Sequence, residues 1–248
     1  MFSTSIKPPE EIFSAIPRWI PDNPTLNNYY GIWLGTPFSR YFINSFTVAI
    51  FNTLSALLVS VFAAYSISRF SFIGRKEFIV GILISQMFPL VLLLIPLFMV
   101  MLSLGLVDTR LGLIITYLTR TLPFSILMLK GYFDGIPFDI EEAAIVDGCS
   151  RTKVLYKIIL PIAAPGIAAV ALFAFILAWQ EFLFALTLTR SASSHTLTVG
   201  LSLMLGERRI LWGRLMAGSV IITIPVTVFF VYLQKYLVQG LTMGAIKG

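Results

Sequence analysis

The chain holds few of the residue types that catalysis requires. His195 is its only histidine and Cys149 its only cysteine, so the sequence offers neither a two-histidine metal site nor an internal disulfide. Ser150 and Lys153 stand at a Ser-x-x-Lys spacing, but the SDN and KTG motifs that accompany an acylating serine are missing. No GxxxxGK[ST] phosphate loop occurs. We therefore predict a chain that is not itself an enzyme, holds no metal and binds no cofactor.

Polar side chains inside long apolar stretches are the remaining candidates for chemistry, because such groups are costly at membrane depth and mark transport paths. They are Asn44, Asn52, Gln86, Arg120, Gln180 and Glu181. Arg120 either faces a wet cavity or marks a short helix from which it snorkels to an interface. Trp179, Gln180 and Glu181 combine an aromatic face with hydrogen-bonding groups, as sugar recognition does. These three residues and Arg120 are our candidate substrate-pathway residues, although a partner subunit can equally carry that site.

The longest charge-rich interval runs from Glu141 to Pro161. Just before it, Asp139 can cap a helix, and Glu142, three residues later, completes a capping box. Gly148 permits the left-handed turn that ends such a helix. The expected apolar face of this helix consists of Ile140, Ala143 and Ala144.

A second amphipathic helix is expected to start near Ser150. Its apolar residues recur at helical spacing, and a proline then marks entry into the next hydrophobic span. These residues are Val154, Leu155, Ile158 and Pro161. The interval therefore predicts a helix, a glycine turn and a second helix.

The spacing of this interval resembles a known motif. Glu142-Ala143-Ala144, three residues, Gly148, nine residues, Ile158, one residue and Leu160-Pro161 are similar to the EAA loop of permease subunits of bacterial ABC importers. A plain solvated loop explains the charges but not five anchors in register. The resemblance implies a cytoplasmic coupling helix that docks on a separate ATPase subunit. It assigns ATPase coupling to Glu141, Glu142, Ala143, Ala144, Asp147, Gly148, Ile158, Leu160 and Pro161.

Four further segments resemble the second permease subunit of maltose- and trehalose-type sugar importers. They are Gln86–Pro89, Lys130–Phe133, Ala178–Phe182 and the tail Gly240–Gly248. The resemblance implies a second permease subunit as heterodimer partner, an ATPase dimer that holds ATP and Mg, an extracytoplasmic sugar-binding protein and a sugar substrate. The tail is expected either to lie against the ATPase pair or to fray.

This sequence departs from that pattern in two ways. Cys149 stands where a small residue such as alanine is usual. Ser5–Pro8 resembles the segment that follows the first membrane helix of such permeases, so that helix is expected to be absent from this sequence.

Composition independently indicates a lipid membrane. Apolar residues make up 57% of the chain and charged residues 12%, and the mean hydropathy is +0.89, all far from soluble averages. The net charge of +6 is spread along the chain, which suits membrane flanks and not nucleic acid.

The hydropathy pattern predicts an all-α integral membrane protein. Residues 1–40 are expected to form an external N-terminal loop segment, and residues 41–248 a transmembrane permease domain that contains the EAA loop at about 137–161. Five hydrophobic segments each approach or exceed the roughly 20 residues that cross a bilayer. They are 41–68, 78–107, 111–129, 158–180 and 215–234. The resemblance implies six helices in the family, arranged as the type I permease fold of ABC importers.

Orientation comes from the resemblance, because the positive-inside rule is nearly silent. The segments assigned to the inside hold nine Lys and Arg residues and those assigned to the outside hold eight. The EAA loop and the C-terminus are therefore placed in the cytoplasm of a bacterium or archaeon, and the chain in its inner membrane, crossing it several times.

Two features of the spans leave alternatives open. A stripe of small residues allows close helix approach, either within this chain or with the second permease subunit. It consists of Ala164, Gly166, Ala168, Ala171, Ala174 and Ala178. Prolines within the spans either shape static helices or provide bends for gating. They are Pro89, Pro96, Pro123, Pro165 and Pro225.

Two other classes of protein compete with an ABC permease. A secondary transporter driven by an ion gradient requires acid-base pairs at membrane depth, for which Arg120 and Glu181 alone supply little. A membrane-embedded enzyme requires clustered His, Asp or Glu, which the spans lack. The sequence therefore favours the permease, with the ion-gradient transporter as the alternative.

Overall fold

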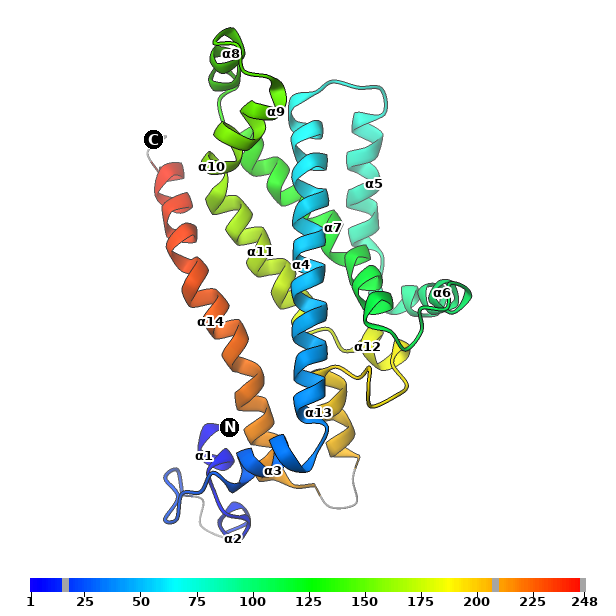
Figure 1. The fold of residues 1–248 in the computed structure, drawn as a ribbon, viewed down its shortest axis with the longest axis vertical. Coiled ribbons are helices and arrows are strands. Elements are labelled where there is room, and N and C mark those ends of the chain that lie inside the picture. Colours follow the sequence, from blue (N-terminus) through cyan, green and yellow to red (C-terminus); the bar gives the residue numbers. More distant parts are fainter. Residues whose placement is uncertain (15–17, 207–209, 246–248) are drawn as a thin grey trace. The chain divides into compact units, whose positions relative to one another are not determined.

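The computed structural model describes residues 1–14, 18–206 and 210–245, and from residue 236 onward only the backbone. Every regular element in these ranges is a helix (Figure 1). The chain divides into two compact units. The first contains Met1–Val48, Leu94–Leu113 and Trp179–Phe229, and the second contains Ala49–Leu93, Ile114–Ala178 and Phe230–Gly248.

The first unit begins with three short helices in the segment that we expected to be a loop. They are α1 (Phe2–Ser5), α2 (Pro9–Ile12) and α3 (Asn27–Gly35). The start of α4 (Phe38–Arg69) follows, so the first long helix begins three residues before the predicted span. The unit also contains α12 (Leu183–Leu188), α13 (Leu197–Leu205) and the first part of α14 (Trp212–Ala245). Its fully buried side chains include Ile32, Phe38, Phe184 and Leu197.

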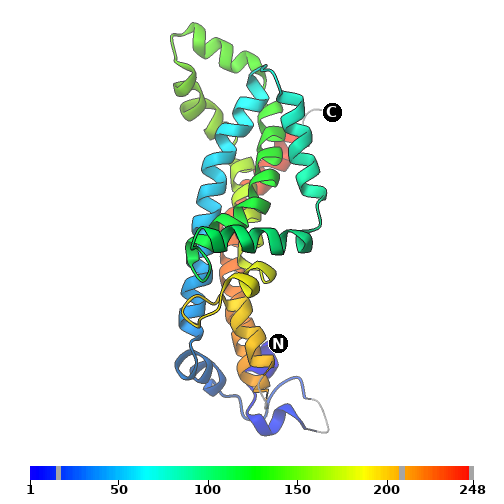
Figure 2. The same cartoon turned by 90° about the vertical axis from the view of Figure 1, so that its right-hand side faces the viewer.

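The second unit holds the rest of α4, α5 (Arg75–Met87) and most of α7 (Arg110–Asp134). After α7 come α8 (Phe138–Val146), α9 (Arg151–Val154), a π turn η1 (Leu155–Ile159), α10 (Leu160–Ile162) and α11 (Ala164–Trp179). One apolar core connects them, in which Tyr65 and Phe133 pack edge to face with ring centroids 6.1 Å apart. Figures 1 and 2 both show α8 beyond the C-terminal end of α4, while α9 lies level with that end in Figure 1.

Three helices among the described residues are long and apolar enough to cross a membrane. They are α4, α7 and the Trp212–Lys235 part of α14. Two further candidates are broken, namely α5 with α6 (Leu90–Ser103), bent by 103°, and Arg151–Ile162 with α11, bent by 76°. The expected five spans are reached only if each bent pair counts as one.

The single span that we predicted at 78–107 is wrong in its continuity, because the helix stops at Met87. Phe88 adopts an extended conformation with ψ of 127°, which is the conformation that a following proline, here Pro89, imposes. Pro89 lies directly before α6, where its missing N–H removes no helix hydrogen bond, so α6 starts at once in a new direction.

The opposite outcome holds for 111–129. Arg120 and Pro123 suggested a weak or divided span, but α7 is one continuous helix of 25 residues. A proline inside a helix is tolerated in membrane proteins, where surrounding groups can satisfy the carbonyl that it leaves without a donor.

The stripe of small residues on α11 is buried in the single chain. Ala168, Ala171, Ala174 and Ala178 are all less than 10% exposed. At Gly166 a β-carbon would lie 2.3 Å from the ring of Tyr132 on α7, so only glycine fits there. Of the two alternatives, packing within this chain accounts for these residues.

A polar clasp in the first unit fixes the loop between α6 and α7 to the loop after α12. Asp108 holds a left-handed conformation with φ of 65°, and its backbone N–H donates to the carbonyl of Leu188 at 2.8 Å. Its carboxylate accepts hydrogen bonds from the backbone N–H groups of Arg190 at 2.7 Å and Ser191 at 3.0 Å, and from the hydroxyl of Ser194. These bonds retain a backbone conformation that few residues other than glycine adopt.

The clasp also shifts the acidity of Asp108. Burial raises the pKa of this carboxyl, but the hydrogen bonds from Ser194, Arg190 and Ser191 outweigh burial and hold the pKa well below its ordinary value of 3.8. The ionised carboxylate of Asp108 therefore stabilises the folded state. This contribution is complete at pH values above the ordinary pKa of the carboxyl group, and it is lost as the pH falls through the lower pKa of the folded state.

We expect Asp108→Asn to lower the free energy of unfolding by about 1–2 kcal/mol at pH 7, because the neutral amide accepts these hydrogen bonds more weakly. Asparagine tolerates the left-handed conformation, so the change tests the charge and not the backbone. Thermal unfolding in detergent at a series of pH values measures this loss of stability. The difference in stability between the variant and the native chain should become smaller below pH 3.8. Asp147→Asn, at the exposed C-terminal end of α8, is the matched control. Equal stability of Asp108→Asn and the native chain at pH 7 would contradict the clasp.

Candidate functional site

The segment from α8 to α10 carries the residues with the most specific sequence signal. Helix α8 begins at Phe138 after Pro137, and no side chain in the described part of the chain caps its N-terminus. The predicted capping box is therefore wrong, since Asp139 lies inside the first turn and not at the cap. Asp139 and Glu141 instead place negative charge in that turn, where it stabilises the positive end of the helix dipole.

The turn after α8 was predicted correctly. Gly148 has φ of +85°, and two hydrogen bonds close the turn, from its N–H to the carbonyl of Ile145 and from the N–H of Cys149 to that of Ala144, both at 3.0 Å. This pair of bonds is the Schellman motif, which requires a left-handed residue at the position of Gly148. Among the described residues, no other atom lies within 4 Å of where its β-carbon would be, so conformation and not space selects glycine.

The second helix begins at the predicted place but is not one regular helix. Ser150 caps α9, and its hydroxyl accepts from the N–H of Lys153 at 3.4 Å. After four residues the chain widens into the π turn η1, and α10 follows with Pro161 in its first turn. Pro161 cannot donate to the carbonyl four residues earlier, and its ring crowds that carbonyl, so a wider turn precedes it.

The buried face of α9 and η1 agrees largely with the prediction, while that of α8 does not. Val154 and Leu155 are at most 4% exposed, and Ile158 is partly buried against the core. On α8, Ile140 and Ala143 are exposed, and only Ala144 of the expected apolar face is buried. A carboxylate, Glu141, takes the inward position beside it and is 3% exposed.

A buried ion pair explains why a charged residue faces inward. The carboxylate of Glu141 accepts from Nε of Arg69 and from the hydroxyl of Tyr65, the latter at 2.8 Å. The side chains of Arg69 and Glu141 are 6% and 5% exposed. Burying a charge is tolerated only when it is paired and hydrogen-bonded, and both oxygens of Glu141 have a partner.

The remaining predicted coupling residues lie on the outside. Glu142, Ala143, Asp147, Gly148 and Pro161 are exposed, while Ile158 and Leu160 are half-buried. Large apolar side chains accompany them, and Val146 is 85% exposed. An open groove of about 360 Å³ adjoins this surface and is lined in part by Phe138, Glu142, Ile145 and Val146. Exposed apolar side chains with a polar rim are typical of a protein interaction surface.

The four candidate substrate-pathway residues fall into two groups. Trp179 is 2% exposed, and its indole N–H donates to the carbonyl of Ile222 at 3.1 Å. Glu181 is 7% exposed, and its two oxygens accept from the backbone N–H groups of Phe184 and Ala185, each at 3.0 Å. These two side chains therefore serve internal packing and the start of α12. Gln180 and Arg120 are exposed.

Arg120 lies near the middle of α7, ten residues after Arg110 and ten before Lys130. Arg110 and Lys130 are the charged residues nearest to the two ends of the apolar part of α7. At 1.5 Å per residue, each lies about 15 Å along the helix from Arg120. The side chain of Arg120 is too short to reach either end by snorkelling. The continuous helix therefore does not support the alternative of a short helix. In the part of the chain that the structure describes, Arg120 forms no ion pair or hydrogen bond.

The other polar residues at membrane depth differ in the same way. Asn44 is fully buried, donates to the carbonyls of Ser193 and His195 at 2.8 Å each and accepts from Arg110 at 2.8 Å. Asn52 is fully buried and accepts from the hydroxyl of Thr121 at 3.2 Å. Gln86 is exposed. Asn44 and Asn52 thus hold helices and loops together.

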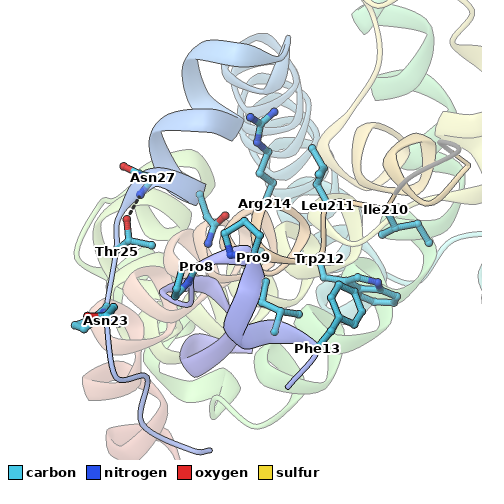
Figure 3. Close-up of a pocket in the computed structure, with 14 residues that line it drawn as sticks. Pro8, Pro9, Phe13, Asn23, Thr25, Asn27, Ile210, Leu211, Trp212 and Arg214 are labelled. Atoms are coloured by element: carbon cyan, nitrogen blue, oxygen red, sulfur yellow. Dashed lines mark hydrogen bonds between the residues drawn. The ribbon is translucent and has the colours of Figure 1, made fainter. Parts of the chain in front are cut away.

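A cavity of about 510 Å³ opens in the first unit between the N-terminal segment and the start of α14 (Figure 3). Its wall includes Phe13 and Trp212, whose aromatic rings line it together with Pro8, Pro9 and Arg214. The N-terminal segment is therefore packed onto the start of α14.

Sequence reasoning missed Tyr65 and Arg69, the two partners of Glu141. A signal was present, since Arg69 is the first charged residue after the 28 uncharged residues of 41–68. It lies at the end of the helix that the predicted topology brings to the same side as the EAA loop. Periodicity could not assign the pair, because it says nothing of contacts between residues 72 positions apart. The tail Gly240–Gly248 has its last three residues, and its side chains, outside the described residues.

Comparisons with known proteins agree with this geometry. The inner membrane ABC transporter permease protein YcjP of Escherichia coli strain K12 is 38% identical over 250 residues, covering 100% of this chain and 89% of that protein. The trehalose/maltose transport system permease protein MalG of Thermococcus litoralis is 42% identical over 228 residues, covering 90% and 82%. The chain is thus similar to permeases over nearly its whole length.

A solved structure extends this similarity to the fold. It is that of a bacterial ABC transporter involved in the import of the acidic polysaccharide alginate, with 26% identity, a TM-score of 0.83, and coverage of 95% of this chain and 88% of that one. The fold is therefore the type I permease fold of ABC importers. The family model described as binding-protein-dependent transport system inner membrane component matches residues 56–243. The chain belongs to this family of membrane permeases.

Proposed function

We propose that this chain is one of two different permease subunits of an ATP-driven sugar importer and forms half of its translocation pathway. The observation that carries the proposal is the hairpin of α8 and α9 around Gly148, with its anchors at the EAA spacing and an exposed surface that includes Glu142 and Val146. In a family of transport permeases, such a surface suits a cytoplasmic partner. The trehalose/maltose permease among the relatives supports a sugar substrate.

The energy of transport comes, in this proposal, from a separate pair of ATPase subunits that bind ATP and Mg. The chain itself has no phosphate-binding loop in its sequence. The EAA loop and the C-terminus then face the cytoplasm, and an extracytoplasmic binding protein delivers the sugar from the other side. Membership in a binding-protein-dependent family supports this arrangement and disfavours transport driven by an ion gradient.

The mechanism follows from the rigidity of the hairpin. The Schellman turn and the buried Glu141 hold α8 in one orientation, so closure of the ATPases on ATP displaces α8 as a body. This displacement tilts the membrane helices and exchanges outward and inward access. A partner that binds the outward-open arrangement more tightly than the inward-open one shifts the population toward the outward-open arrangement, and the reverse holds for a partner that prefers the inward-open one.

Among the pathway candidates, Arg120 and Gln180 best suit contact with the transported sugar. Both are exposed, and an unpaired arginine in mid-membrane is tolerated only beside water or a polar partner. We infer that the face of α7 that carries Arg120 lines the aqueous pathway between the two permeases. Trp179 and Glu181 support the pathway from inside the chain.

Purification of the tagged chain from its native membrane in mild detergent tests the function. We expect a second permease and an ATPase to copurify, and ATP hydrolysis to rise when one sugar-loaded binding protein is added. Mass spectrometry of the partners and an ATPase assay over a panel of sugars measure this. A lone chain without ATPase, under conditions that preserve other importer complexes, would refute the proposal and favour gradient-driven transport.

Gly148→Leu is expected to uncouple ATP hydrolysis from sugar uptake. A side chain at φ of +85° costs about 1–2 kcal/mol, which distorts the turn and reorients α8. Gly105→Leu is the matched control, since Gly105 also has a positive φ, of +67°, and open space around it, but lies outside the EAA loop. Uptake and hydrolysis are measured together in proteoliposomes. Normal uptake by a stably assembled Gly148→Leu complex would count against the proposed role.

Arg120→Gln is expected to raise the KM for sugar uptake about tenfold, because a hydrogen bond from a charged group is worth about 1.5–3 kcal/mol. Uptake in proteoliposomes at varied sugar concentration measures this change. Arg40→Gln, at an exposed position near the start of α4, controls for the loss of one positive charge. An unchanged KM would place Arg120 outside the pathway.

A further inference from the structure

The pair of Arg69 and Glu141 connects two helices that are far apart in sequence. Arg69 is the last residue of α4 and Glu141 lies in the first turn of α8. Along the chain, α8 is joined by backbone only to α7 and α9. The ion pair therefore adds a connection from α8 to a third helix, the long helix α4.

Arg69 holds the start of α8 at three successive points. Its Nη2 donates to the carbonyl of Ile136 at 3.0 Å, just before the helix. Its guanidinium carbon lies 5.8 Å from the ring centroid of Phe138, the first residue of α8. Its Nε donates to the carboxylate of Glu141, one turn farther on. Contacts at residues 136, 138 and 141 fix both the position and the rotation of α8 about its axis.

Tyr65 completes the contact from one turn earlier on α4. Its hydroxyl donates to the second carboxylate oxygen of Glu141 at 2.8 Å, and its ring packs on Phe133 in the core. Both oxygens of Glu141 are thus bound by residues of α4. We call Tyr65, Arg69 and Glu141 the α4–α8 latch.

The latch is stiff because its charges are away from water. Exposed ion pairs exchange with solvent and contribute little, whereas separating a buried pair leaves a charge without compensation. Small displacements of α8 therefore move α4 with it and do not open the pair. The neighbouring Glu142, which is exposed, has no such role in the described structure and remains available to a partner.

We propose that Tyr65 and Arg69 are positioning residues that transmit displacement of α8 directly to α4 through Glu141. The inference rests on the proposed function, because it takes the ATPase as the source of the displacement. In this proposal the two adjacent acids have different roles: Glu141 transmits the displacement within the permease, and Glu142 contacts the ATPase. The EAA motif by itself would assign both acids to docking on the ATPase.

Hydrogen exchange on the purified full chain tests the latch without any partner. In Glu141→Gln, backbone amides of residues 139–146 should exchange about tenfold faster than in the native chain, since a charged hydrogen bond of 1.5–3 kcal/mol is weakened. Amides of α5 should be unchanged. Tyr65→Phe, which removes one hydrogen bond and no charge, should give a smaller increase and serves if Glu141→Gln fails to fold. Native exchange of α8 in the folded variants overturns the latch.

The assembled importer provides the second measurement. Glu141→Gln should keep the affinity for the ATPase but lower the sugar transported per ATP hydrolysed about tenfold, by the same loss of a charged hydrogen bond. Glu142→Gln is the matched variant and should weaken ATPase binding instead. An unchanged ratio in the Glu141→Gln complex overturns the proposal. Failure of the native chain to bind any ATPase refutes the proposed function, and the exchange measurement then decides the latch alone.

Discussion

The arrangement of the EAA segment depends on one buried carboxylate. Glu141 faces inward from α8, where both of its oxygens are bound by residues of α4. A charge in this position is tolerated only while these partners remain, so the structure permits one placement of α8 and penalises others. The exposed face of the same helix, with Glu142 and Val146, is oriented as a consequence. The surface that we propose as the partner's contact is thereby held by an ion pair buried within the chain.

The need for a hydrogen-bonding partner also applies to the polar residues inside the spans. Backbone and side-chain polar groups have no water to bind in a bilayer, so they are satisfied within the protein or face an aqueous path. Asn44 binds two loop carbonyls and Arg110, and Glu181 binds the first N–H groups of α12. Arg120 and Gln180 lack such a role in the described residues. This separation by burial, and not by residue type, distinguishes structural polar residues from those suited to a pathway.

Left-handed residues and prolines determine where the helices end. Gly148 closes α8 with a Schellman turn, while Asp108 reaches a similar conformation because its carboxylate and N–H bind the loop after α12. Pro89 and Pro161 mark a sharp bend and a π turn. At Gly148 and Asp108, hydrogen bonds hold the left-handed backbone conformation. At the two prolines, the ring and the missing N–H prevent a regular helix from continuing. These local conformations set the direction of the next helix.

The sequence by itself determined the membrane class, the helix, glycine turn and helix of the EAA segment, and the family to which the chain belongs, because composition, glycine and anchor spacing are local properties. It placed the start of the second helix and most of its buried face. Only the tertiary structure decided that α5 and α6 are separate helices, that α7 runs through Arg120, and that Trp179 and Glu181 are internal. It also decided that Glu141, not the apolar Ile140, faces inward. That choice depends on Arg69, 72 residues away, and a periodic pattern carries no information about such a partner.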